Sequence, residues 1–340
     1  MIVDLRSDTV TRPSPEMLDQ MMQAPVGDDV FSEDPTIIRL EEKIATLFGM
    51  EAGLFCPSGT MANQIAIRAH TGRLNEIICH ELSHIYNYEN GGYAFNAGVS
   101  IRLVRGERGK MSCEEIESLI QPDHDWLPKT TLLSVENTCN KGGGSVLTIE
   151  EMRSISECGR KHGLKTHLDG ARIFNALITL NEQPSSIHEM FDSISICFSK
   201  GLGAPVGSAI VGSRSFIANC RKHRKVMGGG MRQAGILAAA CIYALDNNVE
   251  RLKLDHSAAQ RLAEVISAQD YAENVLPVDT NILIFDLKKF TANEFLQKID
   301  HEGIKAVAFG PKTIRLVTHL DFTDEMLNYV IEKLKNLSRQ

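Results

Sequence analysis

Short apolar runs recur along the first two thirds of the chain, separated by segments in which apolar residues return every three or four positions. Runs of this length and β-branched content predict buried strands, and the spaced pattern predicts amphipathic helices. The strands are expected at 53–56, 76–79, 100–104, 132–136, 164–168, 193–198 and 208–211. Two of the helices are expected to begin at Ser112 and Thr148, because a glutamate three positions later completes a capping box. Such alternation predicts an α/β fold, a mostly parallel sheet with helices on both faces.

The pattern changes near residue 247. An Ala-rich helix at 233–245 and a second helix at 249–266 are followed by further strands and helices of a different order. The strands are expected at 281–285 and 313–317, and the helices at 291–302 and 323–337. This order predicts a small C-terminal α+β domain, 248–340, after a large domain, 1–247. Residues 1–32 are rich in Pro, Asp, Ser and Thr, which predicts an irregular N-terminal arm of the large domain.

Composition narrows the class of protein. With 340 residues, 43% hydrophobic and 23% charged, the chain is typical of a globular protein of about two domains. A net charge of −7 argues against nucleic acid as the main partner. Neither a membrane span nor a signal peptide is expected, because no apolar run is long enough and charge begins at once. The eight cysteines, scattered without a CxxC, are expected to be free thiols in a reducing cytoplasm, and no metal site is predicted.

Two of the predicted strands end on charged side chains. The run 193–198 leads to Lys200, and the run 164–168 delivers Asp169. Because lysine is rarely buried and loses its charge readily when desolvated, Lys200 is a candidate Schiff-base nucleophile. Taken singly, a solvated lysine or a capping aspartate is the more ordinary interpretation. Together they are the pair that a pyridoxal 5'-phosphate enzyme requires, an amine for the aldehyde and a carboxylate that keeps the pyridine nitrogen protonated.

Further candidates follow other strands at the edge where ligands of such sheets bind. Ser58, Gly59 and Thr60 lie between a strand and a helix, where free amides and the helix dipole attract a phosphate. A helix cap alone is the competing interpretation. His84 follows the strand 76–79 and could stack on a pyridine ring and exchange protons near neutral pH. A hydrogen-bonded turn histidine is its alternative.

Arginines supply candidates for anionic groups. Arg315, between apolar residues of a predicted strand, is suited to a substrate carboxylate, with a structural ion pair as the competing account. Arg172 and Ser7 are further candidates for that carboxylate. The run Gly228–Gln233 could present amides and Arg232 to a phosphate, or form a flexible loop before a helix.

Several motifs resemble one family almost from end to end. They are Leu5-Arg6-Ser7-Asp8-Thr9-Val10-Thr11, Gly27-Asp28-Asp29-Val30, Pro57-Ser58-Gly59-Thr60-Met61-Ala62-Asn63, His167-Leu168-Asp169-Gly170-Ala171-Arg172, Ser199-Lys200-Gly201-Leu202, Gly228 to Gln233 and Ile314-Arg315-Leu316-Val317-Thr318-His319. The chain therefore resembles the low-specificity threonine aldolases. The resemblance implies pyridoxal 5'-phosphate, the aspartate aminotransferase type of fold, and a homotetramer built from dimers with shared active sites. It also implies reversible cleavage of L-threonine or L-allo-threonine to glycine and acetaldehyde.

The resemblance also implies a role for each matching residue. Lys200 would be the Schiff-base lysine, Asp169 the partner of the pyridine nitrogen, and His84 the residue stacked on the ring. Gly59 and Thr60 would bind the phosphate, and Ser7, Arg172 and Arg315 would hold the substrate carboxylate. Arg232 and Lys225 would reach the cofactor region of a neighbouring subunit.

One position departs from the family pattern. Trp126, the single tryptophan of the chain, stands where the family usually has a histidine that contacts the substrate hydroxyl. His124 is two residues away and would substitute only if the loop shifts. The large ring of Trp126 could narrow the pocket for the β-substituent or stack on an aromatic substrate. The residues therefore leave the preference among β-hydroxy amino acids open.

Three alternatives are weighed against this interpretation. Another pyridoxal phosphate lyase, one that eliminates an amino acid side chain, would use the same lysine and aspartate. A non-catalytic cofactor-binding protein is conceivable because of Trp126. A nicotinamide enzyme is disfavoured, since no GxGxxG follows the first strand.

Overall fold

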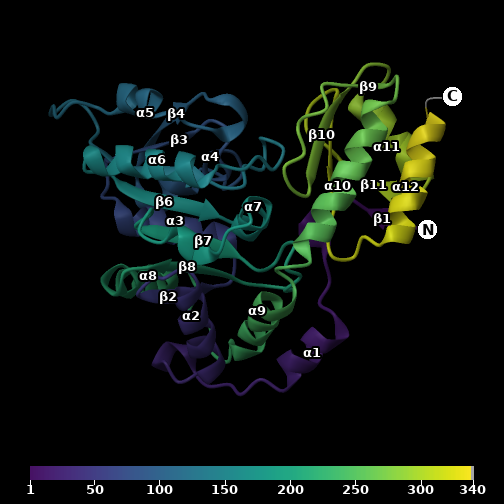
Figure 1. Ribbon diagram of the computed structural model, residues 1–340. Helices are drawn as coiled ribbons and strands as arrows, with labels where there is room; N and C mark the ends of the chain where they lie inside the picture. The colour runs from purple at the N-terminus through teal and green to yellow at the C-terminus, as the bar shows by residue number, and fades with distance from the viewer. Residues whose placement is uncertain (338–340) are drawn as a thin grey trace.

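A seven-stranded sheet forms the centre of the protein in the computed structural model, which describes residues 1–337 (Figure 1). Its strands are β2 (Ala52–Cys56), β3 (Glu76–His80), β4 (Ser100–Val104), β5 (Thr130–Glu136), β6 (Lys165–Gly170), β7 (Ser193–Cys197) and β8 (Ser208–Gly212). They lie in the order β2-β8-β7-β6-β5-β3-β4. β8 runs antiparallel to both neighbours, whereas the remaining pairs are parallel. The predicted α/β fold with a mostly parallel sheet is confirmed.

Helices cover both faces of this sheet because the strand side chains alternate between two apolar clusters. Leu54 and Cys56 pack toward one face and Phe55 toward the other, as the two-residue period of a strand requires. One face carries α2 (Pro35–Leu47), α5 (Cys113–Leu119), α6 (Ile149–Lys161), α7 (Ile173–Leu180) and α9 (Gly235–Asn247). The other carries α3 (Gly59–His70), α4 (His84–Asn87) and α8 (Arg214–Val226). A sheet buried on both faces exposes only its edges and strand ends to ligands.

Residues 252–337 form a second unit, called here the C-terminal lobe. Its helices are α10 (Leu252–Ser267), α11 (Ala292–His301) and α12 (Asp324–Leu337), and its antiparallel sheet has the order β12 (Val307–Ala308), β13 (Thr313–Val317), β10 (Ile282–Leu287), β9 (Ala272–Glu273). The start of the chain also belongs here in space, because β1 (Val3–Asp4) pairs with β11 (Ile304–Lys305). Val3 and Leu5 are buried in the lobe's core, although the predicted division places them in the first domain. The N-terminus and helix α12 both lie on this side in Figure 1.

The N-terminal segment is more regular than its composition predicts. It contains α1 (Pro15–Met22) and the short 3-10 helix η1 (Asp8–Val10). Ser14 caps α1 by accepting a hydrogen bond from the Met17 amide, and Pro15 occupies the first turn, where its missing N–H costs nothing. α1 packs on α9, with Met17 fully buried. The structure therefore corrects the expectation of irregular structure at Pro15–Met22, because a local capping signal and one buried face outweigh the polar composition.

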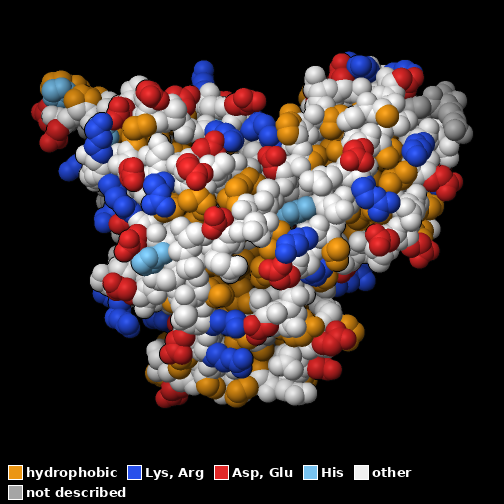
Figure 2. Space-filling model, in the orientation of Figure 1, with side chains coloured by type: hydrophobic (Ala, Val, Ile, Leu, Met, Phe, Trp, Pro, Cys, Tyr) orange, Lys and Arg blue, Asp and Glu red, His pale blue; other side chains and the backbone are white. Residues whose placement is uncertain are grey.

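The face drawn in Figure 2 is hollowed between the seven-stranded sheet and the C-terminal lobe, at the top of the view. Acidic and basic side chains are interspersed over this face rather than gathered into one basic patch. Across residues 1–337, no helix combines the length and the apolar content that crossing a bilayer would need.

Candidate active site

The site is assembled at the carboxyl ends of three adjacent strands. Glu136 at the end of β5 pairs in register with Asp169 of β6, and Asp169 pairs with Ser195 of β7. Lys200 follows β7 in a tight turn, closed by a 2.8 Å hydrogen bond from the Gly203 amide to its carbonyl. The predicted placement of these strand ends at one edge is confirmed. Loop residues beyond parallel strands are where an α/β sheet presents groups to a ligand.

Asp169 is a buried carboxylate held in a fixed orientation. Its Oδ2 accepts a hydrogen bond of 2.8 Å from Asn63 Nδ2, and its Oδ1 accepts one of 3.1 Å from the Ala171 amide. Asn63 is fixed in turn by Ser195, whose hydroxyl donates to Asn63 Oδ1 at 2.7 Å. Because α3 supplies Asn63 and β7 supplies Ser195, two elements besides β6 determine where this carboxylate points.

His84 lies beside the same carboxylates. Its amide donates to Glu136 Oε2 at 2.7 Å, and its ring Nδ1 lies 3.0 Å from Glu89 Oε1. Burial alone would lower the pKa of His84, but the hydrogen bond to Glu89 and the charge of Asp169 outweigh burial and raise it. Burial, reinforced by the charge of Asp169, raises the pKa of Glu136. Both pKa shifts favour the protonated forms of these two neighbouring groups.

The loop between β2 and α3 leads into a helix N-terminus, where free amides would face an anion. Ser58 Oγ accepts a hydrogen bond from the Met61 amide at 3.2 Å, so the predicted cap is present. Gly59 and Thr60 are the first two residues of α3, which leaves their amides free of partners within the helix. A Cβ built on Gly59 would lie 3.6 Å from Ser208 Oγ, a buried hydroxyl without a hydrogen-bond partner in residues 1–337. This cradle suits a phosphate.

Arg172 and Arg315 are both buried but differ in their partners. Arg172 donates two hydrogen bonds of 2.7 Å to the carboxylate of Asp8, so the first turn of the N-terminal segment is tied to the end of β6. Burial alone would raise the pKa of Asp8, but Arg172 and the nearby charge of Lys200 hold it well below its ordinary value. Lys200 is thus close enough to this pair to influence it. Thr11 adds a 3.1 Å hydrogen bond to the Lys200 carbonyl.

Within residues 1–337, Arg315 donates hydrogen bonds only to neutral oxygens. Its Nη1 donates to Asn140 Oδ1 and its Nη2 to the Arg6 carbonyl, both at 2.9 Å, while its buried Nε has no partner in residues 1–337. The guanidinium lies 4.6 Å from the centre of the Phe309 ring. Burial and the charge of Arg172 lower the pKa of Arg315 to about 10. A buried cation without an anionic partner is a suitable place for a carboxylate ligand.

Ser7 adjoins this arginine site through the backbone. It follows Arg6, whose carbonyl accepts the Arg315 hydrogen bond, and its hydroxyl caps η1 by accepting from the Thr9 amide at 3.2 Å. The Thr9 hydroxyl also donates to it, at 2.9 Å. The structure therefore brings the N-terminal segment, β6 and β13 together around the predicted carboxylate position.

Two predicted residues lie apart from this cluster within one chain. Arg232 precedes α9 and forms an exposed ion pair of 2.9 Å with Asp28. Trp126 is 74% exposed and stacks on His124, with ring centres 4.6 Å apart, in the loop between α5 and β5. That loop enters β5 at its amino end, whereas Glu136 lies at its carboxyl end, roughly 20 Å away at the rise of a strand. A contact between Trp126 and a ligand near Lys200 would have to come from another subunit.

Asn63 and Glu89 are site residues that sequence reasoning did not single out. Glu89 is buried and accepts hydrogen bonds from Asn63 at 2.9 Å and from Gln64 at 2.5 Å, in addition to its contact with His84. A weak signal for Asn63 was available, since it ends the motif that begins at Pro57. Glu89 lies in a turn without any pattern around it, so only its long-range contacts show its role.

Comparisons with known proteins agree with the resemblance of the sequence motifs. A model of the family described as beta-eliminating lyase matches residues 4–289. Low-specificity L-threonine aldolase 1 of Arabidopsis thaliana is 42% identical over 337 residues, covering 97% of this chain and 94% of that protein. Low specificity L-threonine aldolase of Escherichia coli K12 is 42% identical over 327 residues, covering 96% of each.

The structure of Leishmania major threonine aldolase superposes with a TM-score of 0.86 over 99% of both chains, at 22% sequence identity. At that identity the likeness concerns the fold. It extends over the seven-stranded sheet and the C-terminal lobe alike.

Proposed function

The chain belongs to the beta-eliminating lyase family, and we propose that it is a pyridoxal 5'-phosphate-dependent aldehyde-lyase for β-hydroxy-α-amino acids. The substrates we propose are L-threonine and L-allo-threonine with their relatives, cleaved to glycine and an aldehyde. The full-length relatives that are 42% identical carry low-specificity L-threonine aldolase names, which supports this substrate class. The observation that carries the proposal is the convergence of Lys200, Asp169 and the start of α3 at one edge of the sheet.

The residues at this edge fit the proposed cofactor. The start of α3 and the unpartnered Ser208 hydroxyl suit its phosphate, Asp169 suits its ring nitrogen, and Lys200 is the amine near them. When bound, pyridoxal 5'-phosphate supplies an aldehyde for a covalent bond to an amine and a ring that accepts the electron pair released at Cα. His84 is proposed to lie against that ring.

The remaining residues would position the substrate and move its proton. Arg315, with Ser7 and Arg172 beside it, is proposed to hold the substrate carboxylate and so to set the orientation of the bond to be broken. His84, or a water that it orients, is proposed to take the proton of the β-hydroxyl, because Glu89 holds its ring and helps to raise its pKa. Trp126 would approach the β-substituent only across a subunit boundary.

The direct test incubates the purified holoenzyme with L-threonine, L-allo-threonine and phenylserine and measures glycine together with the matching aldehyde. Equal amounts of glycine and the aldehyde are expected from at least one of these three amino acids. Replacing Lys200 with Ala is expected to abolish turnover. Turnover by Lys200→Ala at the wild-type rate would contradict the assignment.

A second candidate is β-elimination, which the description of the matching family model favours. The same lysine and aspartate would serve it. Release of pyruvate and ammonia, in place of glycine and an aldehyde, would identify it. A cofactor-binding protein without activity would bind pyridoxal 5'-phosphate tightly and turn over none of the three amino acids.

We also propose a homotetramer of dimers with shared active sites, in which Arg232 and Lys225 reach a neighbouring subunit. Large apolar side chains are exposed on the single chain, among them Met22, Phe95 and Val226, each more than four fifths exposed. Contact with other copies would cover them. Light scattering should give four times the chain mass of 37.6 kDa. If sites are shared, Arg232→Ala should lower activity, and mixing it with Lys200→Ala should restore part of the activity.

We also propose that the protein is cytoplasmic and takes part in glycine formation. It is supported by the eight cysteines, which form no disulfide in residues 1–337. Fractionation of cells that express the tagged protein would test the location.

A further inference from the structure

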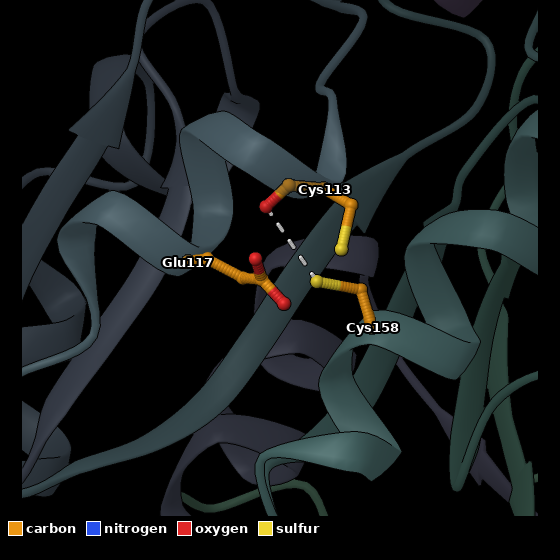
Figure 3. A group of neighbouring side chains, drawn as sticks. All are labelled: Cys113, Glu117 and Cys158. Carbon is orange, nitrogen blue, oxygen red and sulfur yellow. Dashed lines mark hydrogen bonds between the residues drawn. The ribbon is translucent and has the colours of Figure 1, made fainter.

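A second cluster of chemically active side chains lies on the outer helices, away from the strand-end site. Cys113 begins α5 and Glu117 lies one turn later, while Cys158 lies in α6 (Figure 3). The two sulfurs and a carboxylate oxygen all lie within 4.8 Å of one another. Figure 3 shows the three side chains turned toward one another across the contact between the helices.

The four-residue spacing of Cys158 and His162 places a further donor, the His162 imidazole, next to these three side chains. Residues four apart on a helix project from the same face, so Cys113 and Glu117 form one such pair and Cys158 and His162 form another. His162 follows α6 directly, and its Nε2 lies 2.8 Å from Glu117 Oε1. The two thiols and the carboxylate thus form a compact set, and the His162 imidazole lies beside that set through its contact with Glu117.

From this arrangement we propose a binding site for a thiophilic divalent cation, Zn²⁺ in particular, with Cys113, Glu117 and Cys158 as ligands. The His162 ring, which lies beside Glu117, would turn in as the fourth ligand. Tetrahedral Zn²⁺ with bonds of about 2.0–2.3 Å needs donors roughly 3.3–3.8 Å apart. The three donors within 4.8 Å therefore need to close by only roughly 1 Å. Sulfur ligands select Zn²⁺ over Mg²⁺ or Ca²⁺.

The present contacts of these groups are ones that a cation would replace. Cys158 Sγ lies 3.7 Å from the Cys113 carbonyl, a weak contact for a thiol donor. Glu117 also binds Lys161 at 2.8 Å, on the solvent side, where the lysine can be released to water. On binding, each thiol loses its proton to solvent as its sulfur bonds to the metal, so two protons are released for one cation. The bound cation would then hold α5 to α6.

This proposal is independent of the proposed activity, and its test does not read activity. The reduced holoenzyme is titrated with Co²⁺, whose visible bands report tetrahedral thiolate coordination. We expect one equivalent to bind and Zn²⁺ to displace it. The double variant Cys113→Ser/Cys158→Ser should lose the bands, although six other cysteines remain. Glu117→Gln and His162→Asn should weaken binding by about 10-fold or more.

Glu114→Gln is the matched control, because Glu114 is exposed on the same helix and offers no ligand atom to the cluster. Unchanged bands in the double cysteine variant, or no uptake by wild type, would overturn the proposal. So would a native mass showing Cys113 and Cys158 joined as a disulfide under reducing conditions. Should the variants misfold, alkylation of wild type decides: Zn²⁺ is expected to protect the half-buried Cys113, and an unchanged labelling rate would contradict the site.

Discussion

The two buried arginines near the strand ends, Arg172 and Arg315, differ in their hydrogen-bond partners, and this difference predicts different roles for them. Arg172 is neutralised by Asp8 through two short hydrogen bonds. Among residues 1–337, Arg315 donates hydrogen bonds only to one amide oxygen and one carbonyl oxygen, and its Nε has no partner. Because a buried cation is costly without an anion, the structure leaves Arg315 as the group best prepared to receive a substrate carboxylate.

Replacing Arg315 with Lys tests this assignment. The charge is kept but the planar fork is lost, so the paired hydrogen bonds to a carboxylate cannot form. We expect kcat/KM for L-threonine to fall by roughly 10- to 100-fold, the equivalent of about 1.5–3 kcal/mol for a charged hydrogen bond. Arg261→Lys, on the exposed side of α10, is the control. An unchanged kcat/KM in Arg315→Lys would remove this residue from the substrate site.

The contact between Glu89 and His84 predicts a pH effect. Glu89 helps to raise the pKa of His84, so Glu89→Gln should lower that pKa. A base must be unprotonated to act, and activity is therefore lost as the pH falls through its pKa. The acidic limb of the kcat/KM profile should move to lower pH in Glu89→Gln. Glu81→Gln, at a more exposed carboxylate paired with Arg105, should leave the limb in place.

An acidic limb that stays fixed, or moves to higher pH, in folded Glu89→Gln would show that His84 is not the titrating base. Folding is checked by circular dichroism, because Glu89 also accepts hydrogen bonds from Asn63 and Gln64.

Among the elements, α3 has a capped first turn, and the same turn is proposed to bind the cofactor phosphate. Ser58→Ala removes the cap and should lower the free energy of unfolding by about 1 kcal/mol, measured with urea. Thr148→Ala removes the cap of α6 and should cost a similar amount. Only Ser58→Ala should also weaken the binding of pyridoxal 5'-phosphate. Equal cofactor affinity in the two variants would leave Ser58 as a cap alone.

Elements with a local signal could be predicted from the sequence. The seven strands of the large sheet were found because each is a short apolar run, and the capping boxes at Ser112 and Thr148 placed two helix starts correctly. α1 was missed because one capping serine and one proline stood in a polar, proline-rich segment. The pairing of β1 with β11 joins residues about three hundred positions apart, which no local pattern records.

The candidate site likewise contains residues with a local sequence signal and residues without one. Lys200 and Asp169 could be predicted because a charge that ends an apolar strand is visible in the sequence. The partners of Asp169 and His84 could not, since Asn63 and Glu89 act through contacts between separate parts of the chain. Trp126 lies far from the strand ends because its loop precedes β5. The order of elements predicts this position, whereas the motif resemblance alone places Trp126 beside the substrate.

At the scale of the whole molecule, the N-terminal segment joins the two parts of the chain. β1 pairs with the C-terminal lobe, Asp8 binds Arg172 beside the large sheet, and Thr11 binds the carbonyl of Lys200. Asn281 of the lobe also donates to Asp8, at 3.3 Å. The ion pair between Asp8 and Arg172 is therefore expected to stabilise the arrangement of both parts as well as the site.

Asp8→Asn should make this contribution measurable. Leaving Arg172 buried without its anion should cost about 3–5 kcal/mol of unfolding free energy at neutral pH. The pKa of Asp8 is lower in the folded state than the value of about 3.9 expected in the unfolded chain, so its contribution is present above that value and is lost as the pH falls toward the folded pKa. Urea unfolding from pH 7 to pH 3 should show a smaller acid-induced loss in Asp8→Asn than in wild type.

Asp19→Asn, at an exposed carboxylate of α1, is the matched control and should behave like wild type. An acid-induced loss of stability in Asp8→Asn as large as that of wild type would mean that the pair with Arg172 does not carry this part of the stability.

Borohydride reduction of the holoenzyme, followed by mass mapping of its peptides, tests the central claim most directly, because reduction makes the link between pyridoxal 5'-phosphate and its lysine permanent. The account predicts the added cofactor mass on the peptide that contains Lys200 and on no other lysine. Cofactor mass on a different lysine, or none on any peptide of a protein shown to contain the cofactor, would contradict it.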